Sequence, residues 1–95
     1  MKLLEKGYSA IIEELESLKA NWDGDCARPI KKSVLKRFRD MKELSDIIKM
    51  FKSVGFIEAD IDVVPTPEGN IQLEAEKDDR YLEIEIKTST KSQKK

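Results

Sequence analysis

The stretch IQLEAEKDDRYLEIEI, residues 71–86, decides the predicted fold of this 95-residue chain. Apolar and polar side chains alternate along it on both sides of the central pair Asp78 and Asp79. Alternation with a period of two is typical of a strand with one buried face. The stretch therefore predicts an antiparallel hairpin that turns at Asp78 and Asp79. Because Asp-Asp is not a favoured turn pair, a bulged or longer loop stays open.

The segment before this hairpin predicts one more strand. From Phe56 onwards Ile57, Ala59, Ile61 and Val63 alternate with acidic residues, and residues 65–70 (PTPEGN) have the composition of a turn. Three such strands in succession, each with one apolar face, predict a three-stranded antiparallel β-meander.

The first half of the chain predicts helices. Residues 2–20 carry apolar side chains at the spacing of an amphipathic helix, and Asn21 to Gly24 predict its end. Residues 30–54 predict either two helices, about 31–39 and 41–53, or one helix bent near Asp40. Asp40 and Glu43 have the spacing of a capping box, and Gly55 predicts the stop.

The expected fold class is therefore α+β, with two or three N-terminal helices packed on one face of the three-stranded antiparallel meander. Residues 1–87 are expected to form a single domain. Residues 88–95 lack apolar side chains and are expected to form a flexible basic tail.

The register that keeps every apolar side chain on the core side places Val63 opposite Leu73 and Glu74 opposite Glu83. Carboxylates then share the other face of the sheet, from Asp60, Asp62, Glu74, Glu76, Glu83 and Glu85. Directly opposed like charges destabilise a sheet by roughly 0.2–1 kcal/mol per pair. Three interpretations stay open: a solvated face that prevents aggregation, a surface for a cationic partner, or a divalent metal shared by Glu74 and Glu83 with a neighbouring molecule.

Charge is segregated along the chain. Residues 28–55 contain nine basic and three acidic side chains, whereas residues 56–86 contain two basic and ten acidic ones. The basic series, which includes Lys32, Lys36, Arg37 and Arg39, fits either a solvated helix face or contacts with a nucleic-acid backbone. Opposite charges on one molecule also allow two copies to associate as a homodimer.

Composition argues against several kinds of chemistry. The chain has no histidine and one cysteine, Cys26, so it lacks the commonest general base and any internal disulfide or zinc site. We expect no enzymatic activity, no cofactor and no metal site. No signal peptide or membrane span is predicted, and the expected location is the cytoplasm. Trp22 is expected to cover the core where the first helix ends, with a partner contact as the alternative.

Three segments carry a resemblance: Asn21 to Gly24 (NWDG), residues 65–74 (PTPEGNIQLE) and residues 82–86 (LEIEI). The chain resembles a group of small, uncharacterised prokaryotic proteins that share an NWDG turn, then PTPxGxIQLEW, then LEIEI. It departs from that pattern at Ala75, where the group carries Trp, and in its longer stretch between Ile30 and Val63. The resemblance implies a prokaryotic or mobile-element origin and no catalytic residue. The matching positions are Asn21, Trp22, Asp23, Gly24, Pro65, Pro67, Gly69, Gln72 and Glu74.

The sequence thus predicts a non-enzymatic interaction module, antitoxin-like or inhibitor-like, whose acidic sheet face docks a basic protein. The residues predicted to contact that partner are Asp62, Glu74, Glu76, Glu83, Glu85 and Trp22. The alternative is a small nucleic-acid-associated protein that uses the basic helix around residues 31–42, through Lys32, Lys36, Arg37 and Arg39.

Overall fold

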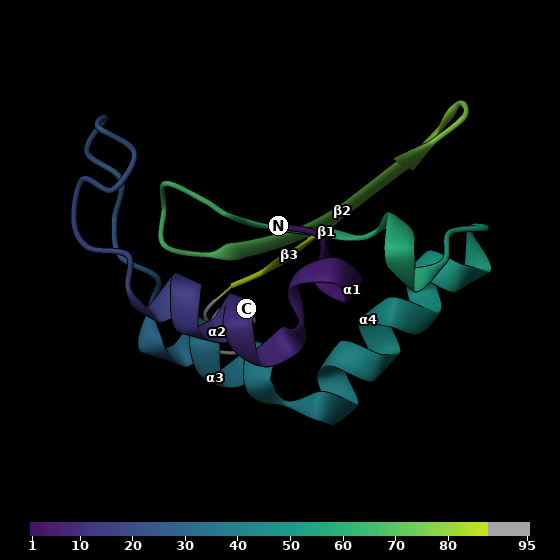
Figure 1. Ribbon diagram of the computed structural model, residues 1–95, viewed down its shortest axis with the longest axis horizontal. Coiled ribbons are helices and arrows are strands. Elements are labelled where there is room, and N and C mark those ends of the chain that lie inside the picture. Colours follow the sequence, from purple (N-terminus) through teal and green to yellow (C-terminus); the bar gives the residue numbers. More distant parts are fainter. Residues whose placement is uncertain (88–95) are drawn as a thin grey trace, which may run out of the picture.

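The predicted α+β architecture is confirmed in the computed structural model, which describes residues 1–87 apart from the side chain of Glu5 (Figure 1). The helices are α1 (Leu3–Lys6), α2 (Tyr8–Glu16), α3 (Lys32–Arg39), α4 (Met41–Ser53) and the short 3₁₀ helix η1 (Glu58–Asp60). The strands are β1 (Asp62–Pro65), β2 (Ile71–Lys77) and β3 (Arg80–Ile86). They form one antiparallel sheet in the order β1-β2-β3. The predicted tail, residues 88–95, lies outside the described residues.

The β2–β3 hairpin has the register that the alternation predicts. Lys77 lies opposite Arg80 and Glu74 lies opposite Glu83, so the turn contains two residues, Asp78 and Asp79. Asp78 adopts φ +57°, a left-handed conformation that aspartate tolerates better than most side chains. The bulged or longer loop that the sequence left open is not formed.

The first strand is shorter than predicted. Residues 58–60 form η1, and β1 begins only at Asp62, although Val63 does lie opposite Leu73. The prediction that Asp60 lies on this strand, on the face shared with the other carboxylates, was therefore wrong. The Asp60 carboxylate instead accepts a hydrogen bond from the Ile57 amide at 2.9 Å. A local bond of this kind offers the backbone an alternative to the ladder of a sheet.

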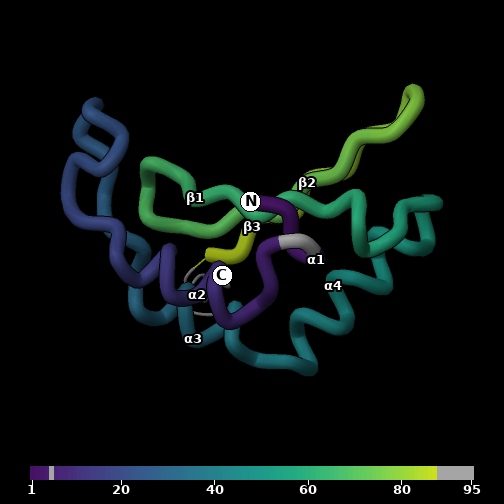
Figure 2. The backbone as a smooth tube through the Cα atoms, viewed as in Figure 1, coloured from purple at the N-terminus to yellow at the C-terminus, as the bar shows by residue number. Residues whose placement is uncertain are grey.

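The single predicted helix over residues 2–20 was also wrong. Gly7 has φ +89° and separates α1 from α2, which ends at Glu16 and not at Asn21. Leu3, the first residue of α1, has no partner for its amide within the helix and donates it to the Ile61 carbonyl at 3.0 Å, beside β1. The tube in Figure 2 shows this N-terminal segment next to β1.

The second helical region consists of two helices that meet at Asp40. The Asp40 carboxylate caps α4, because Oδ1 accepts from the amides of Lys42 at 3.0 Å and Glu43 at 3.3 Å. The reciprocal half of the predicted capping box does not form. Glu43 binds Arg37 of α3 instead, so its carboxylate joins the two helices rather than closing the cap.

The hydrophobic core lies between the sheet and the helices, which gather on one side of the sheet (Figure 1). Helix α3 contacts both β2 and β3, and η1 links α1 and α4 to the same layer. The largest fully buried side chains are Phe38, Phe51, Phe56, Ile11, Leu15, Ile61, Ile71, Leu73, Ile86, Val34 and Val63. Burial of each such side chain stabilises the fold by roughly 1.5–3 kcal/mol, so this layer supplies most of the driving force.

Two loops that are distant in the sequence join at one end of the molecule. Arg28 donates its amide to the Pro67 carbonyl at 2.8 Å, and Lys31 donates to the Gly69 carbonyl at 3.0 Å. Gly69 has φ +89°, and a Cβ atom on it would lie 2.7 Å from the Pro29 carbonyl oxygen. Only glycine fits here, because both the backbone angle and the neighbouring chain exclude a side chain.

We therefore expect Gly69→Ala to lower the free energy of unfolding by roughly 3 kcal/mol, from strain at positive φ and from the collision with Pro29. Gly24→Ala is the matched control, because Gly24 has φ +77° but a Cβ atom on it would meet no other atom within 4 Å. In the control, the free energy of unfolding should fall by only roughly 1 kcal/mol. Urea unfolding measures both values, and equal losses would contradict the predicted collision.

Candidate functional site

The surface of the sheet that faces away from the helices, here called the outer face, carries the polar side chains of β2 and β3. They are Gln72, Glu74, Glu76, Tyr81, Glu83 and Glu85, which alternate with the apolar residues of the same strands. In Figure 1 the helices lie below the sheet, while residues 17–28 and the β2–β3 turn rise above it at opposite ends. The outer face therefore lies between two raised ends.

Neutral groups, and not cations, hold the carboxylates of the outer face. Gln72 Nε2 donates to Glu74 at 2.8 Å, and Asn70 Nδ2 donates to Glu85 at 2.9 Å. Tyr81 Oη donates to Glu83 at 2.6 Å. Within residues 1–87, no ion pair reaches Glu74, Glu83 or Glu85, nor the exposed Glu76. No cation of the described part of the chain forms an ion pair with these four carboxylates, and hydrogen bonds orient three of them.

The Tyr81 hydroxyl lies between two opposed carboxylates. Besides its bond to Glu83, it lies 3.5 Å from Glu74 Oε1. The hydrogen bond to Glu83, with smaller contributions from desolvation and the Glu74 charge, raises the pKa of Tyr81 to about 12. A phenol that keeps its proton supplies a hydrogen-bond donor where two like charges meet, which offsets part of their repulsion.

The remaining acidic residues predicted for this face have different surroundings. Asp62 lies opposite Glu74, but its carboxylate is 3.4 Å from Lys2 Nζ and 3.8 Å from the N-terminal amino group. Asp60, in η1, lies 3.9 Å from Lys77 Nζ. Both charges have partners within the molecule. The structure therefore brings Glu74, Glu76, Glu83 and Glu85 together and leaves Asp60 and Asp62 at the margin.

Trp22 does not cover the core, so that prediction was wrong. The half-buried indole donates from Nε1 to the Arg28 carbonyl at 2.7 Å, inside the loop that joins α2 to α3. Its neighbours act in the same way: Asn21 Oδ1 accepts from the Cys26 amide at 2.7 Å, and Asp23 Oδ1 accepts from the Asp25 amide at 2.8 Å. The side chains of the NWDG segment shape their own loop, because Asn and Asp readily bond nearby backbone. The segment that contains Trp22, residues 17–28, lies at the opposite end of the sheet from the β2–β3 turn (Figure 1).

Two of the four basic residues predicted to contact nucleic acid form ion pairs within the molecule. The Arg37 guanidinium binds the Glu43 carboxylate, a hydrogen bond that raises the pKa of Arg37, and its Nη1 donates to the Lys87 carbonyl at 2.7 Å. Arg39 forms an ion pair with Glu16. Lys32 and Lys36 are exposed one turn apart on α3. The basic helix therefore offers fewer free charges than the sequence indicates.

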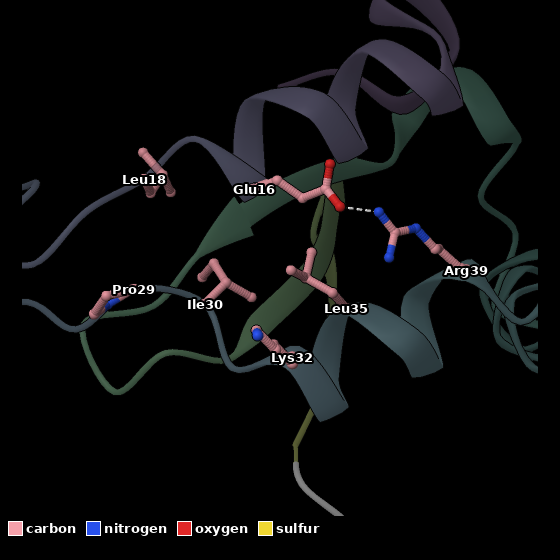
Figure 3. Close-up of a pocket in the computed structure, with 7 residues that line it drawn as sticks. All are labelled: Glu16, Leu18, Pro29, Ile30, Lys32, Leu35 and Arg39. Atoms are coloured by element: carbon pink, nitrogen blue, oxygen red, sulfur yellow. Dashed lines mark hydrogen bonds and ion pairs between the residues drawn. The ribbon is translucent and has the colours of Figure 1, made fainter.

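A hollow lies on the helical side of the molecule (Figure 3). Its volume is about 470 Å³, and it is lined by Glu16, Leu18, Pro29, Ile30, Lys32, Leu35 and Arg39. Figure 3 shows the Glu16–Arg39 ion pair at one side of an otherwise mostly apolar wall. The hollow holds none of the residues predicted to contact a protein partner.

Sequence reasoning missed two surface features. The pairing of residues 1–3 with β1 has no pattern of its own, because a segment this short shows no periodicity. Leu4 and Met41 fit the apolar spacing of their predicted helices but are 58% and 63% exposed, beside a hollow between α1 and α4. Exposed apolar residues cannot be told from core residues by spacing alone.

Two features are absent from residues 1–87. No three side chains of the His, Cys, Asp or Glu type lie close enough together to hold a metal ion. None of the helices in this part of the chain has the length and apolar character needed to cross a bilayer.

Comparison with known proteins gives no relative for this chain. It matches no protein family model, no curated protein and no solved structure. The resemblance to small prokaryotic proteins with an NWDG turn stays a prediction.

The Tyr81 geometry predicts a pH-dependent signal. In a Tyr8→Phe background, where Tyr81 is the only tyrosine, the phenol should titrate near pH 12 rather than near its ordinary value of 10. Glu83→Ala should lower that midpoint, and the control Glu13→Ala should not. Because native Tyr81 holds its proton more tightly than the unfolded chain, its contribution to stability is complete below pH 10 and is lost as the pH rises through about 12.

The ultraviolet absorbance of the phenolate measures the midpoint, and circular dichroism confirms that the fold persists. A midpoint that does not change in Glu83→Ala would contradict the assigned hydrogen bond.

Proposed function

We propose that this protein is a non-enzymatic interaction module whose outer face docks a basic partner protein, as an antitoxin-like or inhibitor-like protein does. The residues of contact are Glu74, Glu76, Glu83 and Glu85, with Asp62 at the margin of the surface. The exposed, unpaired thiol of Cys26 suits a reducing cytoplasm as the place of action.

One observation carries this proposal. Cations elsewhere among residues 1–87 form ion pairs, as Arg37 does with Glu43 and Lys6 with Glu14. In the same part of the chain, the hydrogen bonds to Glu74, Glu83 and Glu85 come only from neutral donors. The two basic residues that flank the β2–β3 turn also form ion pairs away from these carboxylates, Lys77 with Asp60 and Arg80 with Asp78. A row of aligned negative charges attracts a cationic surface and speeds its association.

The rival interpretation is a solvated face that only prevents aggregation. Solvation alone gives no reason for the carboxylates to be held in fixed orientations. Tyr81 and Asn70 restrict the rotamers of Glu83 and Glu85, and this lowers the entropy that the side chains lose when a partner binds. Preorganisation of this kind favours the docking proposal.

Nucleic-acid binding through Lys32, Lys36, Arg37 and Arg39 remains the second candidate. It is the weaker one, because Arg37 and Arg39 would have to leave Glu43 and Glu16 before they could contact phosphate. Each such exchange replaces one charge pair by another and adds little affinity.

The test is capture of proteins from a lysate of the native host by the immobilised chain. Glu76→Lys with Glu83→Lys should abolish capture of a basic partner, because it reverses two exposed charges on the outer face. Glu13→Lys with Asp46→Lys is the matched control, since it makes the same change in net charge on exposed positions of α2 and α4. Raised salt should weaken capture by the wild-type chain.

Identical capture by both double variants would end the docking proposal. A gel shift that is lost on Lys32→Glu with Lys36→Glu would support the nucleic-acid candidate instead.

A further inference from the structure

The two edges of the sheet differ in how their backbone groups are satisfied. At the β1 edge, Val63 donates its amide to the Met1 carbonyl at 2.7 Å, and the Met1 amino group donates to the Val63 carbonyl at 3.0 Å. Beside them the Leu3 amide donates to the Ile61 carbonyl, and Lys2 lies opposite Asp62 in an antiparallel β-bridge. The N-terminal residues therefore close the β1 edge.

These bonds also determine which backbone groups of β3 point outward. In an antiparallel ladder, successive residues bond alternately to the two neighbouring strands. Because Val63 bonds outward, Asp62 and its opposite residue Glu74 bond to each other across β1 and β2. The next residues of β2, such as Leu73, then bond to β3, where Leu73 lies opposite Ile84.

It follows that the amides and carbonyls of Tyr81, Glu83 and Glu85 point away from β2. Within residues 1–87, no backbone or side-chain group bonds to them. The β3 edge is therefore open, and its unpaired donors and acceptors form a template for another strand.

The apolar side chains of β3 are also less completely buried than those of β2. On β2, Leu73 and Ala75 are 0% and 3% exposed, whereas their opposite residues Ile84 and Leu82 are only partly buried. The helices cover the middle of the sheet more fully than this edge. A further strand beside β3 would shield both side chains and extend the hydrophobic layer.

Charge decides what kind of strand fits. If a second copy paired its own β3 in the antiparallel sense, for example with Glu83 opposite Glu83, carboxylates would lie about 4.5–5.5 Å apart between Cβ atoms. Such opposition is destabilising, so self-pairing is disfavoured. A strand with Lys or Arg at every second position would instead place cations against Glu83 and Glu85.

We propose that the β3 edge receives an extended segment of the partner protein, in which basic residues alternate with apolar ones. The basic side chains would lie on the outer face, and the apolar ones would lie beside Leu82 and Ile84. This proposal rests on the proposed function, and it adds that the partner is bound by strand addition rather than by surface charge alone.

The test uses two synthetic peptides of the same composition as probes. In one, lysine alternates with valine and threonine; in the other, the lysines form one block. Fluorescence anisotropy should show roughly tenfold tighter binding of the alternating peptide, because only that pattern matches the pleat. Amide hydrogen exchange should slow at Tyr81, Glu83 and Glu85 when it binds.

A pair of variants separates the backbone from the charge. Glu83→Ala and Glu83→Pro remove the same carboxylate, but only proline removes the outward amide. Proline is tolerated on an edge strand where the amide is unused, so the hairpin should persist, as circular dichroism can verify. Glu83→Pro should bind the alternating peptide at least about tenfold more weakly than Glu83→Ala does.

The outcomes separate this proposal from the one on which it rests. Equal binding of both peptides, without protected amides, would overturn strand addition and leave docking on the outer face intact. If neither peptide binds, both proposals are overturned. Slow exchange at these amides in the free chain would show that the chain itself occupies the edge, through a second copy or its own residues, and would overturn strand addition.

Discussion

The pleat of β2 is the constraint on which the rest of the structure depends. This strand is bonded on both sides, and its apolar residues Ile71, Leu73 and Ala75 are almost completely buried. A slip of one residue would turn Leu73 to solvent and Glu74 into the core, at a cost that no local rearrangement could offset. The positions of the outer carboxylates are therefore a consequence of the core, and the β2–β3 turn transmits the same alternation to β3.

The remainder of the chain completes this sheet unevenly. Residues 1–3, at the start of α1, occupy the β1 edge, and nothing among the described residues does the same for β3. The polar side chains of the long loop after α2 form hydrogen bonds to the backbone of the same loop. The end of this loop is joined to the β1–β2 turn, where Lys31 donates its amide to the Gly69 carbonyl. The β1 edge of the sheet is thus closed by backbone contacts. Among the described residues, the β3 edge stays unpaired, and β3 also carries part of the carboxylate row.

The parts of the fold that were predictable follow from short-range patterns. The hairpin register follows from alternation around a two-residue turn. The capping pattern at Asp40 located the boundary between α3 and α4, although the sequence left one bent helix open as the alternative. The grouping of Glu74, Glu76, Glu83 and Glu85 was predictable for the same reason, because a strand assigns every second side chain to one face.

The errors arise where a local or distant bond competes with periodicity. Residues 57–61 alternate like a strand, yet the Asp60 carboxylate closes a turn on Ile57. Trp22 follows a helical stripe, yet its indole bonds to a loop carbonyl. The neutralisation of Arg37 and Arg39 by Glu43 and Glu16 depends on how three helices pack, which the order of residues does not reveal.

The loop that holds Trp22 has a consequence for how unfolding is observed. Trp22 is the only tryptophan of the chain, and its half-buried ring lies outside the hydrophobic cluster. Its fluorescence emission therefore reports the solvation of the loop and says little about the melting of the phenylalanine-rich interior. An emission curve and a backbone dichroism curve measure two different events in this molecule, and agreement between them would mean that the loop and the interior unfold as one cooperative unit.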